Sequence, residues 1–228
     1  MSRFARASAL ANDVMMKARG RALRVMADTL PSSVVFQHGP RTSRKVALTF
    51  DDGPGPMTRE YLDVLDKARA PAAFFVIGNQ CAAHSDALAE TARRGHDVAG
   101  HGWSHTPFTK LPTRELESEL AKTAAILPPH RARARMVRPP YGRMTPRSLL
   151  SSFRAGFSSA MWSFDPLDWQ AQTADDVVRA VDPAKLQGGD IILLHEERRT
   201  TLDALPEIIR RVRAAGFELA TVSELVPL

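Results

Sequence analysis

The sequence predicts a barrel-like α/β fold built on about seven parallel strands. Short segments rich in apolar, β-branched and aromatic residues alternate with segments whose apolar residues recur every three or four positions. This alternation runs without a break from residue 45 onwards, and the 228 residues suit one generous domain. Strands that alternate with helices pair in parallel, because a parallel connection needs a helical crossover. An open, doubly wound sheet is the alternative fold.

Several of the predicted strands are apolar throughout, as expected in a sheet covered on both faces. Strands are predicted at Val46–Phe50, Ala72–Ile77, Asp97–Ala99, Arg135–Arg138, Phe157–Ser163, Ile191–Leu194 and Phe217–Val222. One-faced helices are predicted between them, at Thr58–Arg69, Ser85–Arg94, Thr113–Leu127, Thr145–Ala155, Ala174–Leu186 and Leu202–Ala215. Three of these helices are followed by a glycine suited to a left-handed C-cap, namely Gly95, Gly156 and Gly216.

The net positive charge of the chain lies in its first 44 residues. Eight basic and two acidic side chains give this segment a charge of +6, which equals the charge of the whole chain, so residues 45–228 are neutral overall. We therefore divide the sequence into a basic, helical N-terminal arm (1–44) and a folded domain (45–228). A nucleic-acid-binding domain would carry its basic residues on the folded core, so nucleic acid is not an expected partner.

Apolar residues of the arm recur at helical spacing between positions 4 and 30. Two interpretations remain open: this helix packs its apolar stripe on the barrel, or it lies on an anionic membrane face. No apolar run approaches the roughly 20 residues of a membrane-spanning helix, and the first residues lack the compact apolar core of a secretory signal. We therefore expect a cytoplasmic protein, with peripheral contact to the inner membrane face through residues 1–30 as the second interpretation.

Ionisable and polar residues follow five of the predicted strands. Parallel α/β proteins carry their chemistry at this end of the strands. The five segments are Thr49-Phe50-Asp51-Asp52-Gly53-Pro54, His101-Gly102-Trp103-Ser104-His105, Arg138-Pro139-Pro140-Tyr141-Gly142, Asp165-Pro166-Leu167-Asp168-Trp169 and Leu193-Leu194-His195.

The spacing of His101 and His105 indicates a metal site. Residues four apart face the same way on a helical turn, and a carboxylate would complete a two-histidine, one-carboxylate site with an open position, as in catalytic metal centres. The adjacent Asp51 and Asp52 repel each other unless a cation or an arginine compensates. The alternatives are a solvated turn for the histidines and a plain turn for the aspartates, because Asp, Gly and Pro favour turns.

The five segments resemble, in order, the five motifs of the polysaccharide deacetylase family, also known as carbohydrate esterase family four or the NodB homology domain. The resemblance covers residues 45 to about 225, and Thr-Phe-Asp-Asp-Gly-Pro at 49–54 is its most specific part. It implies a distorted (β/α) barrel of seven parallel strands, in agreement with the strand pattern.

The resemblance implies that Asp52, His101 and His105 are the ligands of one divalent metal ion. Zinc is the usual ion of the family, and cobalt, nickel or manganese also suit a donor set of nitrogen and oxygen. The single cysteine, Cys81, excludes a zinc site built on several cysteines.

The resemblance also implies the catalytic roles. Asp51 is the expected general base that activates a water molecule, with Arg138 as its ion-pair partner. His195 is the expected general acid that protonates the departing amine, and Asp168 is expected to orient it.

Three further residues are expected to contact the substrate. The backbone N–H of Tyr141 would donate to the carbonyl oxygen, Trp169 would wall the pocket, and Leu193 would form the apolar floor for the acetyl methyl group. The sequence departs from the family at two positions. Gly102 replaces the usual Ser or Thr after the first histidine, so that either Ser104 substitutes for its hydrogen bond or the metal binds more weakly, and Glu196 stands where an Asp is common.

The expected function is that of a metal-dependent hydrolase that removes N-acetyl groups from an oligo- or polysaccharide and releases acetate. Exopolysaccharide or chitooligosaccharide-type biosynthesis is the expected setting. An O-acetyl esterase or a hydrolase of non-sugar amides on the same site is the second hypothesis. A non-catalytic glycan-binding module is the third, and the loss of a metal ligand or of the base would favour it.

Overall fold

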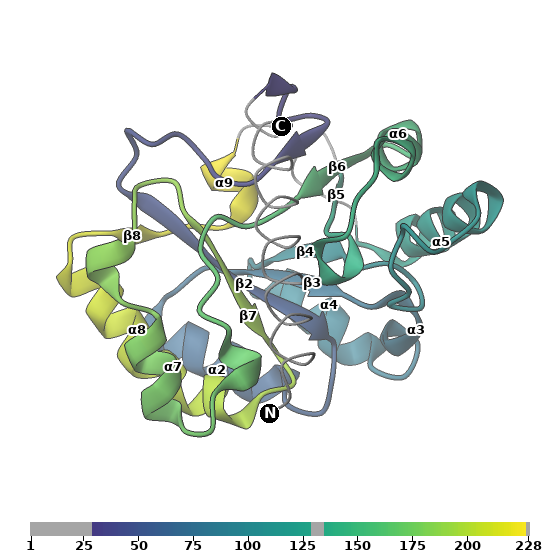
Figure 1. Cartoon of the computed structure of the whole chain (residues 1–228). Helices are drawn as coiled ribbons and strands as arrows, with labels where there is room; N and C mark the ends of the chain where they lie inside the picture. Colours follow the sequence, from purple (N-terminus) through teal and green to yellow (C-terminus); the bar gives the residue numbers. More distant parts are fainter. Residues whose placement is uncertain (1–28, 129–134, 227–228) are drawn as a thin grey trace, which may run out of the picture.

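The computed structural model describes residues 29–128 and 135–226, and its strands form one curved parallel sheet (Figure 1). The strands are β1 (Val35–Phe36), β2 (Lys45–Gly53), β3 (Ala73–Val76), β4 (Asp97–Gly100), β5 (Arg135–Val137), β6 (Phe157–Ala160), β7 (Ile191–His195) and β8 (Glu218–Leu219). Their order in the sheet is β1-β6-β5-β4-β3-β2-β7, and β8 pairs with the start of β2. All these ladders are parallel.

Most of the helices cover the outside of the sheet, whereas Val222 and Leu225 of the last one pack against inward-facing strand residues. The helices are α2 (Thr58–Ala68), α3 (Gly78–Cys81), α4 (Ser85–Arg93), α5 (Thr113–Ile126), α6 (Pro146–Arg154), α7 (Ala174–Ala180), α8 (Arg199–Ala214) and α9 (Val222–Leu225), with short 3₁₀ turns η1 (Pro140–Gly142), η2 (Asp168–Gln170) and η3 (Pro183–Lys185). In Figure 1, α2, α7 and α8 lie together on one side of the sheet and α5 and α6 on the other. Among the described helices, none has the length and apolar character needed to cross a membrane.

The sheet closes on itself through irregular contacts rather than through a regular ladder. Phe164, which follows β6, forms a parallel bridge with Ile192 of β7. The N–H of Phe164 donates to the carbonyl of Ile191 at 3.1 Å, and the N–H of Leu193 donates to the carbonyl of Phe164 at 3.0 Å. The predicted fold class, a distorted barrel of parallel strands, is therefore confirmed.

The two faces of each strand enter different apolar clusters, because successive side chains of a strand point to opposite faces. The outward face packs under the helices, with Leu48, Phe50 and Phe74 among its buried residues. The inward face carries an alanine on each of four strands, Ala47, Ala73, Ala99 and Ala160, together with larger residues such as Phe75 and Ile191. Continued alternation along these strands carries inward-facing positions to their carboxyl ends, where the ionisable residues lie.

The chain turns after three helices as expected. Gly95, Gly156 and Gly216 have φ angles of +86°, +82° and +83°, the left-handed conformation that glycine adopts without strain. Three predicted elements are shorter than expected by more than two residues, one of them the strand predicted at Phe157–Ser163, which ends at Ala160. The helix predicted at Ala174–Leu186 stops at Ala180 before the turn η3, and the strand predicted at Phe217–Val222 gives way to α9, which Thr221 caps.

The sequence predicted a helical arm over residues 1–44, and residues 30–44 of that segment contain a strand in place of a helix. Val35 and Phe36 form β1, which pairs with β6, and both side chains are buried. Arg41 forms an ion pair of 2.5 Å with Asp190, and Arg44 donates to the carbonyl of Gly216. Two residues are too few to show the periodicity of a strand. The net positive charge of the segment indicated an arm outside the folded domain instead. The amphipathic stripe predicted at 4–30 lies almost wholly outside the described residues.

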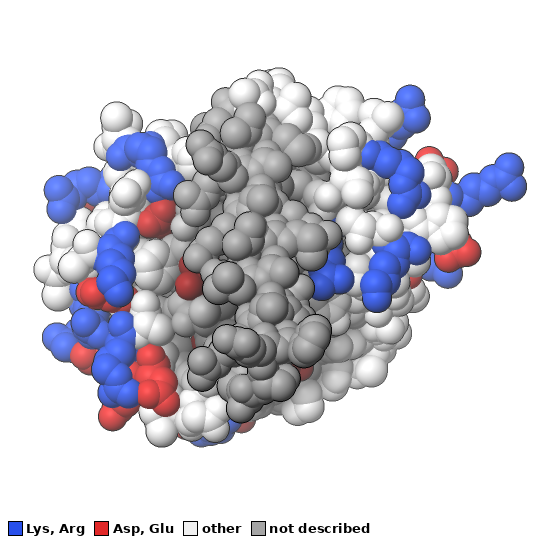
Figure 2. Space-filling model, viewed as in Figure 1, with Lys and Arg blue, Asp and Glu red and all other residues white. Residues whose placement is uncertain are grey.

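The outer faces of the helices carry paired charges. Figure 2 shows basic and acidic side chains side by side over the edge formed by α7 and α8. Arg210 contacts Glu207 at 2.6 Å, and Arg199 contacts Asp203 at 2.9 Å. Such exposed pairs contribute little to stability.

If β1 belongs to the folded barrel, Phe36→Ala should lower the free energy of unfolding by about 3 kcal/mol, as for other buried phenylalanines. Phe153→Ala is the matched control, because Phe153 is 48% exposed on α6. Its effect should stay within about 0.5 kcal/mol. Urea unfolding followed by circular dichroism measures both, and equal effects would show that β1 is not part of the cooperative core.

Candidate active site

A β-bulge in β2 brings two neighbouring carboxylates to one site. Asp51 pairs with Phe75 of β3 and Gly53 pairs with Val76, so Asp52 is the extra residue, and its φ is +73°. A bulge re-aims the side chain that it carries. Without it, adjacent strand residues would point to opposite faces, whereas here both carboxylates approach the same histidine.

That histidine, His101, follows β4. Its Nε2 lies 3.6 Å from Asp51 Oδ2 and 3.5 Å from Asp52 Oδ1. Its Nδ1 lies 2.8 Å from the carbonyl oxygen of Arg138 and must donate to it, since a carbonyl only accepts. Burial lowers the pKa of His101, so the ring is neutral and its Nε2 lone pair faces the carboxylates. A metal ligand requires this state.

Asp52, His101 and His105 form a cluster suited to a metal ion. Their ligand atoms all lie within 4.8 Å of one another, and His105 Nε2 is 3.1 Å from Asp52 Oδ1. Burial raises the pKa of Asp52, but the interactions of its carboxylate with His105 and His101 outweigh the effect of burial. The pKa of Asp52 therefore lies below its usual value. Among the described residues, Asp52 Oδ1 is buried without a hydrogen bond. A divalent cation would satisfy this oxygen, and two imidazoles with one carboxylate are a donor set for zinc and its neighbours.

Asp51 is held by a completely buried arginine. Arg138 Nη1 lies 2.5 Å from Asp51 Oδ1 and 2.9 Å from Thr49 Oγ1. The remaining nitrogens donate to backbone carbonyls, Nε to Ala160 at 3.1 Å and Nη2 to Met161 at 3.2 Å. Arg138 therefore compensates the charge of Asp51 and fixes one of its oxygens, leaving the other free toward His101.

His195 is oriented from behind by Asp168. Its Nδ1 lies 2.7 Å from Asp168 Oδ1, and its backbone N–H donates to Oδ2 at 2.9 Å. The hydroxyl of Thr201 also donates to Oδ2, at 2.7 Å. Burial lowers the pKa of His195, but the hydrogen bond and charge of Asp168, with Asp51 and Asp52, outweigh it and raise the pKa to about 9. His195 is therefore protonated at neutral pH, as a general acid must be.

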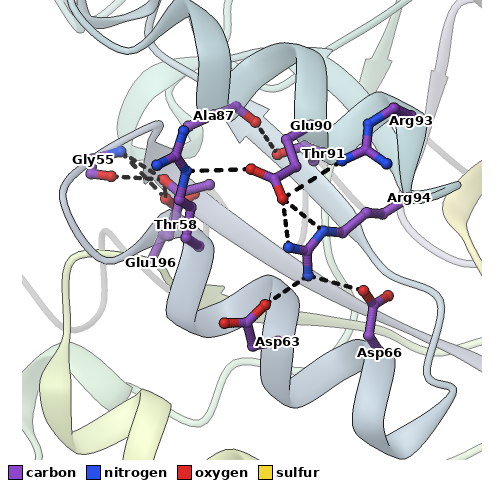
Figure 3. A network of polar contacts seen from close by, with 11 residues as sticks. Gly55, Thr58, Asp63, Asp66, Ala87, Glu90, Thr91, Arg93, Arg94 and Glu196 are labelled. Carbon is purple, nitrogen blue, oxygen red and sulfur yellow. Dashed lines mark hydrogen bonds and ion pairs between the residues drawn. The ribbon is translucent and has the colours of Figure 1, made fainter.

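Glu196 supports the loop that follows the two aspartates (Figure 3). Its carboxylate is buried and contacts the hydroxyl of Thr58 and, at 3.3 Å, the N–H of Gly55. Its backbone N–H donates to the carbonyl of Asp51 at 2.9 Å. A side chain on Gly53 would collide with this carboxylate. Burial raises the pKa of Glu196 to about 7. Glu196, which stands where the family commonly has Asp, therefore places its carboxylate against the loop that follows Asp52. The sequence did not predict this supporting role.

A cavity of about 390 Å³ opens beside the metal cluster. Tyr141 is one of its lining residues and is 62% exposed, with its ring centre 4.8 Å from that of His105. The other two residues predicted to contact substrate do not line it: Trp169 is half-exposed on η2, and Leu193 is buried on β7. The lining residues are Asp52, Ile77, Asn79, Gln80, Ser104, His105, Tyr141 and Glu197.

Comparison with known proteins links this site to one family. The family model described as "Polysaccharide deacetylase" matches residues 38–160. The chain is 34% identical over 200 residues to a chitooligosaccharide deacetylase of Bradyrhizobium sp. (strain ANU 289), covering 80% of this chain and 91% of that protein. It is 36% identical over 184 residues to the peptidoglycan-N-acetylmuramic acid deacetylase PdaC of Bacillus subtilis (strain 168), which covers 79% of this chain but only 38% of PdaC.

Solved structures show the same fold. The Bc1960 peptidoglycan N-acetylglucosamine deacetylase is 27% identical and superposes with a TM-score of 0.79, covering 85% of this chain and 93% of that one. BA3943 of Bacillus anthracis, a CE4 family pseudoenzyme, is 22% identical, with a TM-score of 0.77 over 87% of this chain and 70% of that one. At that identity the likeness concerns the fold alone.

The geometry predicts opposite behaviour for the two neighbouring aspartates. Asp52→Asn should weaken zinc binding by more than about 100-fold, because losing a ligand costs more than losing an outer partner of a ligand. Asp51→Asn should retain zinc, because Asp51 is held by Arg138 and lies outside the cluster. Elemental analysis of the purified variants and zinc titration decide between them. Zinc loss in Asp51→Asn with full loading of Asp52→Asn would reverse the assignment.

Proposed function

Because the chain belongs to the polysaccharide deacetylase family, we propose that it is a metal-dependent hydrolase that removes N-acetyl groups from a glycan and releases acetate. One observation carries this proposal. The three-residue cluster Asp52, His101 and His105 lies beside Asp51, whose Oδ2 is 3.6 Å from His101. A buried carboxylate and a protonated His195 at the same end of the barrel provide a base and an acid for amide hydrolysis.

The cluster would hold one divalent cation, with zinc as the first choice and cobalt, nickel or manganese as alternatives. Such a cation supplies Lewis acidity, which polarises the acetyl carbonyl and makes a water molecule more acidic. The donor set fits this group, and so does the buried Asp52 Oδ1, which has no hydrogen-bond partner among the described residues.

The residues of the chain supply the proton transfers. The free oxygen of Asp51 takes a proton from water as the water oxygen bonds to the acetyl carbon. His195 donates its proton to the amide nitrogen, so that the C–N bond breaks and the sugar leaves as a neutral amine. Asp168 holds the Nδ1 side of His195 and stabilises the charged ring before the transfer. We assign to Tyr141, which lines the cavity, the donation of its backbone N–H to the carbonyl oxygen, as the family resemblance implies.

The proposed substrate is an oligosaccharide that contains N-acetylglucosamine, and the proposed setting is exopolysaccharide or chitooligosaccharide-type biosynthesis in the cytoplasm. The similarity to chitooligosaccharide deacetylases supports the substrate class. The lining of the cavity also supports it, because amide, hydroxyl and carboxylate groups such as those of Asn79, Ser104 and Glu197 suit the hydroxyls of a sugar.

Purified protein should release acetate from N-acetylglucosamine oligomers, as measured by mass spectrometry of the sugar and an acetate assay. A chelator should abolish the release and added zinc should restore it. Zinc-loaded Asp51→Asn is the control for adventitious hydrolysis and should lose a factor of about 10² to 10⁴. Peptidoglycan fragments and an O-acetylated polymer are assayed in parallel. Release from the O-acetylated polymer alone would replace the amidase assignment by that of an esterase.

The proton held by His195 predicts the alkaline limb of the pH profile. The protonated ring is the active form, so kcat/KM should fall as the pH rises through the pKa of His195, near 9 in the metal-free protein. Asp168→Asn removes the charge that raises this pKa, so the limb should move to lower pH and the maximal rate should fall. An unchanged limb in Asp168→Asn would exclude His195 as the acid.

A further inference from the structure

The loop between the two histidine ligands, residues 102–104, lies between two helices outside the barrel. On one side it is bound to α3, where the N–H of Gly78 donates to the carbonyl of Gly102 and the N–H of Asn79 to that of Trp103, both at 2.9 Å. The ring of Trp103 packs so closely on Gly78 that a side chain there would collide with it. The loop is therefore fixed on its α3 side by backbone contacts.

On the other side, a single carboxylate of α5 binds the loop. Glu119 Oε2 accepts from the N–H groups of Trp103 and Ser104, each at 3.4 Å. Its Oε1 accepts from the hydroxyl of Ser104, which also lies 2.8 Å from Thr106 Oγ1. Successive backbone N–H groups that converge on an anion form a stable nest. Glu119 therefore satisfies three donors of the loop at once.

This loop adopts a conformation that needs support. Gly102 has φ of +78°, and His105, which carries a Cβ, has φ of +59°. The left-handed region is unfavourable for such a residue, so its neighbours must hold it there. Gly102 also has no side chain with which to tie the loop to its surroundings.

The two histidines differ in what holds them. His101 directly follows β4, and its Nδ1 donates to the carbonyl of Arg138. The described contacts of the His105 ring are with Asp52, His101 and Tyr141, all of which belong to the site itself. The position of His105 therefore depends on the loop that precedes it.

We propose that Glu119, acting through Ser104, is a positioning residue for the metal ligand His105. The carboxylate holds the loop in the conformation that directs the His105 ring toward Asp52, and so sets the affinity of the cluster for its ion. This inference rests on the proposed metal-dependent function. It assigns to α5 a role in metal binding, although no residue of that helix belongs to the cluster.

The test compares Glu119→Ala and Glu119→Gln with Glu117→Ala, since Glu117 is exposed on the same helix. Zinc affinity is measured by competition with a chromophoric chelator, and the cobalt-loaded proteins are compared by visible absorption. Glu119→Ala should weaken zinc binding by about 10- to 100-fold, the usual cost of removing an outer partner of a metal ligand, and should alter the cobalt spectrum. Glu119→Gln should recover part of the affinity, because its amide oxygen still accepts hydrogen bonds. Glu117→Ala should match the unaltered protein.

A double substitution tests the route through His105. If Glu119 acts by holding this ligand, adding Glu119→Ala to His105→Ala should cause no further loss of zinc affinity. Additive losses would overturn the proposed route.

Two outcomes separate this inference from the proposed function. If the unaltered protein binds zinc and Glu119→Ala keeps its affinity and cobalt spectrum while losing thermal stability, Glu119 only joins helix to loop and the inference is wrong. If the unaltered protein binds no zinc, the metal-dependent function itself fails.

Should Glu119→Ala not fold, Ser104→Ala removes the same hydroxyl contact with less disturbance. It should still weaken zinc binding several-fold, and unchanged binding would again overturn the proposal.

Discussion

The buried ion pair between Arg138 and Asp51 is the interaction on which the site depends. Arg138 is fully buried inside the barrel, where its guanidinium stacks 3.8 Å over the ring of Phe75 and joins β2 to the last residue of β6 and the residue after it. Breaking such a pair typically costs about 3–5 kcal/mol, whereas apolar residues of similar size would serve stability as well or better. The ion pair therefore serves the site by positioning side chains rather than by stabilising the fold. The same arginine orients Asp51 with its side chain and His101 with its carbonyl oxygen.

The rest of the barrel accommodates this arrangement. Alanines on the inward faces of β2, β3, β4 and β6 leave room for a long charged side chain in a narrow interior. The backbone departs from ordinary geometry mainly where the site is built. Among the described residues other than glycine, positive φ occurs at Asp52, His105, Tyr141 and Leu167, all in segments that follow or end the strands, and otherwise at Arg69, which ends α2. Strained conformations gather at functional sites because the surrounding contacts hold them there.

Features that depend on residues close together in the sequence were predicted, whereas features that depend on contacts between distant residues were not. The strands, the glycine turns and the cluster of ionisable residues were predicted because they rest on patterns within a few residues. β1 was missed because two residues become a strand only through pairing with β6, more than 100 positions away. The bulge at Asp52 was not predicted either, since an Asp-Asp pair looks the same in sequence whether or not the strand register shifts. The resemblance to a family supplied the roles of Asp51 and His195, which spacing alone left open.

The supports of the metal cluster were also hidden from the sequence, because each comes from another element. The loop after Asp52 packs against Glu196 at the end of β7 and Thr58 at the start of α2, and the loop before His105 is held by Glu119 of α5. His101 directly follows β4 and is held by the carbonyl of Arg138, and Asp52 lies on the bulge of β2. The barrel thus places two of the ligands, whereas the third, His105, depends on the loop that Glu119 of α5 holds. The fold shared with BA3943, described as a pseudoenzyme, makes the consequence clear: the barrel does not by itself make a deacetylase. On the proposed function, activity needs the metal ligands, the base and the acid together, and in this chain the residues assigned to these roles lie at the same end of the sheet.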